Sequence, residues 1–169
     1  TTLYTETREI AIDPEQVRAL QSDRRLPFPA DSELHPNEYL LLRSAKGRAY
    51  SALARVAGDR SAIHLIRQFK GGVCGIHARN KEQYYAVDAL LDEQVQLVTL
   101  MGKAGTGKTL LAIAAAMHLC LKQKQFRHAL ICRPTFPVYD ITARRAGANV
   151  TYVDLDPDSF AYDIEAILS

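Results

Sequence analysis

The sequence predicts an α/β fold, in which a parallel sheet flanked by helices follows a smaller β-rich lobe. A glycine-rich loop near residue 105 lies between an apolar run and a helix-forming stretch. Short apolar segments separated by glycine turns precede that loop, and strand-like and helix-like segments alternate after it. A chain of 169 residues with 47% hydrophobic content is large enough to bury a core of this kind.

The glycine-rich loop Gly102–Thr109 matches the phosphate-loop pattern G-x-x-x-x-G-K-[ST] at every position. The apolar run 95–101 before it predicts a buried strand, and residues 110–121 after it predict a helix. Residues 128–133 predict the next buried strand of the parallel sheet. In such a loop, backbone N–H groups surround phosphate oxygens, the lysine binds the β- and γ-phosphates, and the hydroxyl holds Mg²⁺. A chance match in a glycine-rich turn is the alternative. The candidate nucleotide-binding residues are Gly102, Lys103, Ala104, Gly105, Thr106, Gly107, Lys108 and Thr109, with Lys108 also a candidate catalytic residue and Thr109 the candidate Mg²⁺ ligand.

Residues 79–92 predict a helix just upstream of the loop. Asn80 is a plausible N-cap, and Tyr84, Val87 and Leu90 belong to an apolar stripe. In many helicase-like nucleotide-binding domains a glutamine on the preceding element reads the adenine edge, because a carboxamide both donates and accepts. Gln83 is the candidate for that role; an exposed polar residue without a ligand is the alternative.

The first 78 residues predict a small β-rich lobe. Residues 1–37 are expected to be largely irregular, with a short strand or helix at 8–12 and 14–20. Segments 39–43, 47–56 and 63–69 predict an antiparallel sheet of three or four strands. In the last segment the alternation places Ile63 and Leu65 inward and His64 and Ile66 outward.

Positive charge is concentrated in the same lobe. Residues 43–81 carry nine Lys or Arg and one acid, although the whole chain has a net charge of only +2. Basic residues among aromatic ones are typical of a groove for single-stranded nucleic acid, and a solvated sheet face is the alternative. A groove would require most of the basic side chains on one face: Arg43, Lys46, Arg48, Arg55, Arg67 and Lys70.

Composition narrows the class of protein. No apolar run approaches the roughly 18 residues that a membrane span needs, so no membrane partner is expected. Three cysteines without a C-x-x-C pair favour buried thiols in a reducing cytoplasm. The chain begins with threonine rather than methionine, so we expect it to be a piece of a longer protein.

From about residue 37 to 137 the chain resembles the PhoH-like ATPases. The motifs that carry the resemblance are P-N-E-Y at 36–39, S-A-L-A-R at 51–55, G-I-x-A-R-N-x-E-Q at 75–83, V-x-L-V-T-L-x-G-K-A-G-T-G-K-T-L-L-A at 95–112 and R-P-x-x-P at 133–137. The resemblance implies a three-layer RecA-like core that uses ATP and Mg²⁺, a β-rich accessory segment and often RNA-directed activity in the cytoplasm.

The segment 133–169 contains P-T-F-x-x-Y at 134–139, A-G-A-x-V at 146–150 and D-I-E-A-I-L at 163–168. With these motifs it resembles a short segment of the histidinol-phosphate aminotransferases. The glycine-rich segment and the later acidic strand end of the PhoH-like pattern have no match there, so the chain is interpreted as a fusion. The tail predicts a helix at 138–146, a strand at 150–153 and a helix at 159–168. It has no counterpart of the aminotransferase lysine segment, so pyridoxal phosphate is not expected. Three parts follow: an accessory lobe (1–78), a phosphate-loop half-domain (79–137) and a tail (138–169) that completes the sheet.

Asp154, at the end of the predicted tail strand, is the candidate for the missing Mg²⁺-directed acid. It would face the metal only if its strand lay next to the strand that precedes the loop. Neither that acid nor an arginine finger is recognisable, so ATP binding with weak or absent hydrolysis is the leading prediction. A module for RNA or single-stranded nucleic acid and a chimera without selected function are the alternatives, and an oligomer is possible for each.

Overall fold

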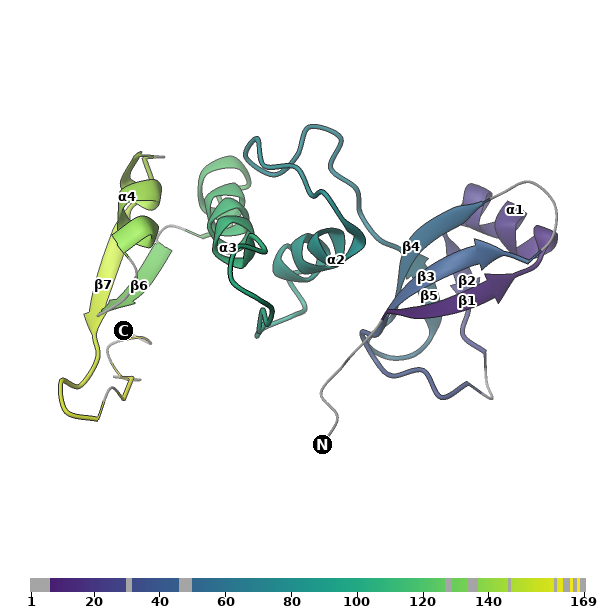
Figure 1. Ribbon diagram of the computed structural model, residues 1–169, viewed down its shortest axis with the longest axis horizontal. Helices are drawn as coiled ribbons and strands as arrows, with labels where there is room; N and C mark the ends of the chain where they lie inside the picture. Colours follow the sequence, from purple (N-terminus) through teal and green to yellow (C-terminus); the bar gives the residue numbers. More distant parts are fainter. Residues whose placement is uncertain are drawn as a thin grey trace. The chain divides into compact units, whose positions relative to one another are not determined.

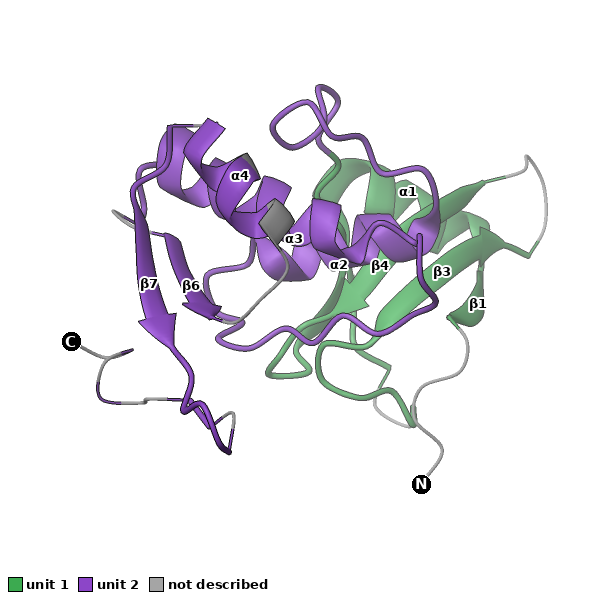
Figure 2. Cartoon of the chain, turned by 60° about the vertical axis from the view of Figure 1, so that its left-hand side comes forward, with its two compact units in different colours: residues 1–68 green, residues 69–169 purple. Residues whose placement is uncertain are grey.

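The computed structural model describes residues 7–29, 32–45, 50–126, 129–133, 137–145, 147–159, 161–162, 165 and 167. The chain divides into two units, unit 1 (residues 1–68) and unit 2 (residues 69–169), which Figure 2 shows in different colours. Both units combine helices with strands, so the predicted α/β class is confirmed at that level.

Unit 1 is built around one five-stranded sheet with strand order β1-β3-β4-β5-β2. Strand β1 is parallel to β3, and every other neighbouring pair is antiparallel. The elements of unit 1 are β1 (Arg8–Ile12), α1 (Pro14–Asp23), β2 (Arg25–Pro27), β3 (Tyr39–Ser44), β4 (Ser51–Val56) and β5 (Ala62–Leu65).

Helix α1 starts where the sequence supplies a complete capping box. The Asp13 carboxylate accepts the backbone N–H groups of Glu15 and Gln16 at 2.9 and 2.8 Å. The Gln16 side chain in turn accepts the Asp13 N–H at 3.0 Å. Pro14 occupies the first helical position, where its missing N–H costs nothing. The helix ends at Arg24, which adopts a left-handed conformation with φ 57°.

The core of unit 1 lies between α1 and one face of the sheet (Figure 1). Successive strand residues point to opposite faces, so the buried set repeats every second residue, as at Leu40 and Leu42 in β3. Leu20 of α1 packs into this cluster and is fully buried. The cluster comprises Ile12, Leu20, Leu26, Leu34, Leu40, Leu42, Ala54, Val56 and Ile63.

Two expectations for unit 1 were wrong. The sheet is mixed rather than antiparallel, because β1, in the segment 8–12 that was expected as a short strand or helix, pairs in parallel with β3, and the unpredicted β2 pairs with β5. Ile66 is buried rather than turned outward. Strand β5 ends at Leu65, so the alternation of inward and outward side chains does not continue to Ile66.

Unit 2 has a helical core and a separate pair of strands. Residues of α2 (Lys81–Leu90) and α3 (Lys108–Met117) pack with Val73 and Leu91 into one cluster, which also includes Leu111, Ala114 and Ala115. A π-helical turn, η1 (His118–Lys122), extends α3. Strands β6 (Ala129–Arg133) and β7 (Val150–Asp154) are parallel, and α4 (Pro137–Arg145) contacts both of them and α3.

The strand expected at 95–101, next to the glycine-rich loop, is not formed. Residues 95–103 have no secondary structure, and Leu97 and Met101 are 84% and 74% exposed. Of the three predicted parallel strands, the structure has the two that pair with each other, β6 and β7. A strand requires a hydrogen-bonding neighbour, and within the described residues segment 95–101 has none, so Leu97 and Met101 stay on the surface.

The predicted closing helix at 159–168 falls largely outside the described residues. Among the described residues, no helix combines the length and the apolar character that crossing a membrane requires.

Candidate nucleotide-binding site

The glycine-rich loop Gly102–Thr109 turns at residues 104–105 and runs directly into α3, whose first residue is Lys108. Residues 102–106 are exposed and residues 107–109 are half-buried, so the loop is open to solvent at the helix N-terminus. Gly107, the N-cap of α3, has φ 82°, a left-handed conformation that residues with a side chain adopt at a cost. Gly105 has a similar φ of 78°. The free N–H groups and the helix dipole make such a terminus favourable for an anion.

The Lys108 side chain curls back into the loop. Its ammonium donates to the carbonyl oxygens of Gly102 at 2.8 Å and Lys103 at 2.7 Å, and to the Thr106 hydroxyl at 3.2 Å. The Thr106 hydroxyl also donates to the Lys103 carbonyl at 2.9 Å. The positive charge therefore lies inside the loop, at the place where a phosphate group would be bound.

Gln83 of α2 contacts this loop through its carboxamide. Its Nε2 donates to the Thr106 carbonyl at 3.2 Å, and its Oε1 accepts the Arg79 backbone N–H at 2.8 Å. A Cβ added at Gly107 would lie 3.3 Å from the same Nε2, so the glycine allows the close approach. The structure thus brings the predicted adenine-reading residue to the loop itself.

Local sequence explains why Gln83 is placed there. Asn80 caps α2 by accepting the Gln83 N–H at 2.9 Å, which fixes the first turn of the helix. Val87, farther along α2, packs with Leu111 of α3 in the core of unit 2. The same packing that joins the two helices therefore holds Gln83 beside the loop.

Thr109, the candidate Mg²⁺ ligand, is the second residue of α3 and is half-buried. Among the described residues, no group of three or more His, Cys, Asp or Glu side chains could hold a metal ion. The residues present fit a Mg²⁺ ion that is bound mainly through a nucleotide's phosphates and waters, since Mg²⁺ commonly takes few protein ligands.

Asp154 is engaged elsewhere. It ends β7, where its carboxylate pairs with the Arg133 guanidinium of β6 at 2.9 and 3.1 Å, and its side chain is 71% exposed. The two residues are direct partners in the β6–β7 register. Because segment 95–101 is not a strand, β7 does not lie beside a strand that leads into the loop, which was the arrangement required for a metal-facing Asp154.

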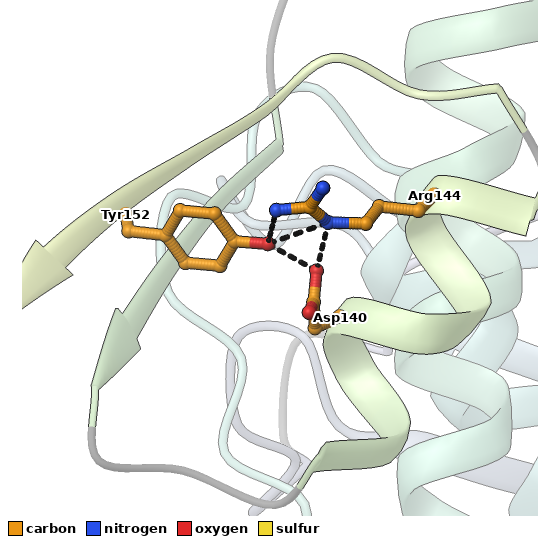
Figure 3. A network of polar contacts seen from close by, with 3 residues as sticks. All are labelled: Asp140, Arg144 and Tyr152. Atoms are coloured by element: carbon orange, nitrogen blue, oxygen red, sulfur yellow. Dashed lines mark hydrogen bonds and ion pairs between the residues drawn. The ribbon is translucent and has the colours of Figure 1, made fainter.

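A polar network in the tail was not predicted. Figure 3 shows Asp140 and Arg144 of α4 converging on Tyr152 of β7. Arg144 Nε donates to Asp140 at 2.6 Å, Arg144 Nη2 donates to the Tyr152 hydroxyl at 2.8 Å, and that hydroxyl donates to Asp140. Hydrogen bonds from Tyr152 and then Arg144 lower the pKa of Asp140 below its usual value. The spacing of four residues between Asp140 and Arg144 was the available sequence signal.

The basic side chains of unit 1 are only partly brought together. Arg43 and Arg55 lie on the sheet face opposite the core. Tyr39 and Arg43 are four residues apart in β3 and therefore point to the same face, and Arg55 of β4 is the register partner of Tyr39. Arg43 forms an ion pair with Glu9 at 2.9 Å, which offsets its charge. Arg67 is exposed beyond the end of β5, and Lys70 is an exposed residue of unit 2. Lys46 and Arg48 lie outside the described residues.

Comparison with known proteins identifies similar sequences over much of the chain. A family model described as PhoH-like protein matches residues 75–161, slightly more than half of the chain. Protein PhoH2 of Thermobispora bispora is 32% identical over 135 residues, and Protein PhoH2 of Mycolicibacterium smegmatis is 33% identical over 137 residues. Each alignment covers 80% of this chain and 30% of the relative.

Protein PhoH2 of Bacillus subtilis is 34% identical over 104 residues, which are 62% of this chain and 24% of that protein. The chain therefore spans less than a third of the length of these relatives. No solved structure matches the chain significantly.

Proposed function

Since the chain belongs to the PhoH-like protein family, we propose that unit 2 binds a nucleoside triphosphate, with ATP as the expected nucleotide. The observation that carries the proposal is the Lys108 ammonium held inside Gly102–Thr109 at the N-terminus of α3. In the bound state the ammonium exchanges its two carbonyl partners for the β- and γ-phosphates, and backbone N–H groups bind the remaining oxygens. The Thr109 hydroxyl would hold a Mg²⁺ ion, which would supply positive charge to neutralise the phosphates.

Turnover by this chain is proposed to be weak or absent. Phosphoryl transfer needs an oriented water and added positive charge near the γ-phosphate. Asp154, the candidate acid, is paired with Arg133 and so is not positioned to orient that water. Nucleotide binding depends on the loop, which this chain contains. We therefore expect nucleotide binding without efficient hydrolysis.

The arrangement of the parts is proposed as predicted from sequence: a β-rich accessory lobe (1–78), a phosphate-loop half-domain (79–137) and a tail (138–169) that continues its fold. The aminotransferase resemblance of the tail stays a prediction, as do a three-layer parallel sheet, a cytoplasmic location, oligomerisation and a chimera without selected function. The family match up to residue 161 favours a tail that belongs with the loop.

Equilibrium titration with Mg·ATP tests the proposal. Lys108→Ala removes the charge that meets the phosphates and is expected to weaken binding at least tenfold, whereas Lys103→Ala in the same loop changes it by less than about threefold, since a charged hydrogen bond contributes about 1.5–3 kcal/mol. Lys103 contacts the Lys108 ammonium through its backbone carbonyl, which Lys103→Ala retains. Lys103→Ala therefore matches Lys108→Ala in the loss of one lysine charge from the loop. Equal affinities of wild type and Lys108→Ala would exclude the assignment.

A second candidate function is binding of RNA or another single-stranded nucleic acid through segment 43–81 and the face of the unit 1 sheet to which its strands contribute. One observation favours it. Strand register places Tyr39, Arg55, His64 and Arg25 in a single row across the sheet, on the face opposite the core. The Arg55 guanidinium lies over the Tyr39 ring, 5.6 Å from its centroid. Such a row offers charge for phosphates and a ring for base stacking.

Titration with an oligouridine at several salt concentrations tests this candidate. Arg25→Ala is expected to reduce the slope of log affinity against log salt by about 0.7 to 1, because one phosphate contact is lost. Arg18→Ala, on exposed α1, is the control and leaves the slope unchanged. Binding that does not respond to salt would leave the solvated sheet face as the interpretation.

A further inference from the structure

Gln83 already uses both ends of its carboxamide within the protein. Its Oε1 accepts the Arg79 N–H at 2.8 Å, and its Nε2 donates to the Thr106 carbonyl at 3.2 Å. Both partners are backbone groups, one just before α2 and one in the phosphate loop. A single side chain therefore links two main-chain segments that are 27 residues apart in the sequence.

The contact acts on the part of the loop that must be positioned most accurately. Thr106 directly precedes Gly107, the N-cap of α3, and its hydroxyl is one of the oxygens around the Lys108 ammonium. Fixing the Thr106 carbonyl sets the orientation of the following peptide N–H, because one planar peptide unit carries both. The Gly107 N–H is one of the backbone N–H groups at the helix N-terminus that would bind phosphate oxygens.

We propose that Gln83 is a positioning residue that braces the phosphate loop through the Thr106 carbonyl, so that its effect on binding is independent of the base. The inference rests on the proposed function of the loop and differs from the adenine-reading role expected from sequence. An adenine reader would discriminate between bases, because its carboxamide must match N6 and N7. A brace affects any ligand whose phosphates occupy the loop.

Gln83→Met tests the brace with little change in side-chain size. The variant keeps an unbranched side chain beside Gly107 but loses both hydrogen bonds. We expect a loss of affinity of about tenfold, the usual value for one or two neutral hydrogen bonds, and the same factor for ATP, GTP and inorganic tripolyphosphate. A loss confined to ATP, or no loss for any of the three ligands, overturns the proposal. Glu82→Ala, on the neighbouring exposed position of α2, is the control.

Gln83→Glu separates a brace from a general structural role by its pH dependence. The ionised carboxylate can still accept the Arg79 N–H, but it cannot donate to the Thr106 carbonyl. The protonated acid regains an O–H donor and has nearly the shape of the amide. The ratio of wild-type to variant affinity for tripolyphosphate should therefore fall towards one as pH decreases through the carboxyl range, near 4–5. A ratio that stays constant with pH contradicts the brace.

A third measurement needs no ligand, which separates this inference from the proposed function. In the nucleotide-free protein, Gln83→Met should accelerate hydrogen exchange at the Arg79 amide and at the loop amides 102–107, with an unchanged melting temperature. If wild type binds no phosphate compound, the proposed function fails, and this exchange pattern still decides whether Gln83 braces the loop. Unchanged exchange at both places refutes the brace.

Discussion

Unit 1 buries its apolar side chains more completely than unit 2 does. In unit 1 all five strands are paired in one sheet, and α1 covers the buried face. In unit 2 the only sheet among the described residues has two strands. Every large hydrophobic side chain that is exposed in the described part of the chain belongs to unit 2: Leu97, Met101, Leu110, Phe126, Leu130, Ile141 and Tyr162.

Among the described residues, the contacts that hold the candidate site come from α2 and α3 rather than from the β6–β7 sheet. The glycine-rich loop is held by the α2–α3 cluster, by the Gln83 carboxamide and by the Lys108 ammonium. The two hydrogen-bonding side chains both donate to backbone carbonyl groups of the loop. Apolar packing should therefore dominate the stability of unit 1, and backbone geometry should dominate the order of the loop region in unit 2.

The largest expected contrast is between a buried and an exposed leucine. Leu42→Ala removes a side chain that is 0% exposed in the core of unit 1, and should lower the free energy of unfolding by about 2–5 kcal/mol. Leu97→Ala, at 84% exposure in unit 2, should change it by less than about 0.5 kcal/mol. Denaturant titration of both variants checks the contrast. A comparable cost for Leu97→Ala would mean that segment 95–101 is packed in solution.

A pair of glycines in the turn before α2 gives the next contrast. Gly72 has φ 69°, and an added Cβ would lie 2.6 Å from the Ile76 carbonyl oxygen, within a turn closed by backbone bonds between Val73 and Ile76. Gly75→Ala, with φ 79° and open space, should cost only the roughly 1–2 kcal/mol of a left-handed residue. Gly72→Ala should cost more, because the backbone must also move. Thermal unfolding of the two variants measures the difference, and equal costs would contradict the described turn.

The two helix N-caps allow a matched test in both units. Asp13→Ala removes the capping box of α1, and Asn80→Ala removes the cap of α2, each at an expected cost of about 1 kcal/mol. Only Asn80→Ala should also weaken binding of Mg·ATP, because α2 carries Gln83. Unfolding and nucleotide titrations on both variants check this. Weakened binding in Asp13→Ala as well would show that the loop senses general stability instead.

The smallest expected effect concerns pH and the tail network of unit 2. Tyr152 and Arg144 hold the pKa of Asp140 below its usual value, so the stabilisation is complete above the ordinary aspartate pKa near 3.9. It is lost as pH falls below that value, through the lower pKa of the folded state. Asp140→Asn should therefore lower the melting temperature more at pH 7 than at pH 3. Asp158→Asn, outside the network, is the control, and a pH-independent effect of Asp140→Asn would contradict the described contacts.

Local signals in the sequence predicted local structure well. The caps at Asn80 and the glycine-rich pattern before Lys108 placed α2 and α3, and apolar runs placed β6 and β7. Pairing between distant segments was harder to predict. Segment 95–101 has the composition of a buried strand, but composition does not show whether a neighbouring strand is available. Segment 8–12 was expected as a short strand or helix, and the parallel pairing of β1 with β3, made through the crossover that contains α1, was not predicted.

The candidate site was predictable as a list of residues but not as a set of contacts. The motif identified Lys108 and the loop glycines, whereas the partners of Gln83 and of Asp154 depend on side-chain geometry. Gln83 meets the Thr106 carbonyl, and Asp154 meets Arg133 across the β6–β7 pair. A motif fixes which chemical groups are present, and the packing of α2 against α3 decides what they contact.

Hydrogen exchange with and without Mg·ATP tests the central claim that unit 2 binds nucleotide through the loop. The account predicts slower exchange in peptides that cover residues 102–113, and no change in the β1–β5 sheet of unit 1. Lys108→Ala should abolish the slowing at the same Mg·ATP concentration. Slowing that is absent from 102–113, or that occurs only in unit 1, would contradict the account.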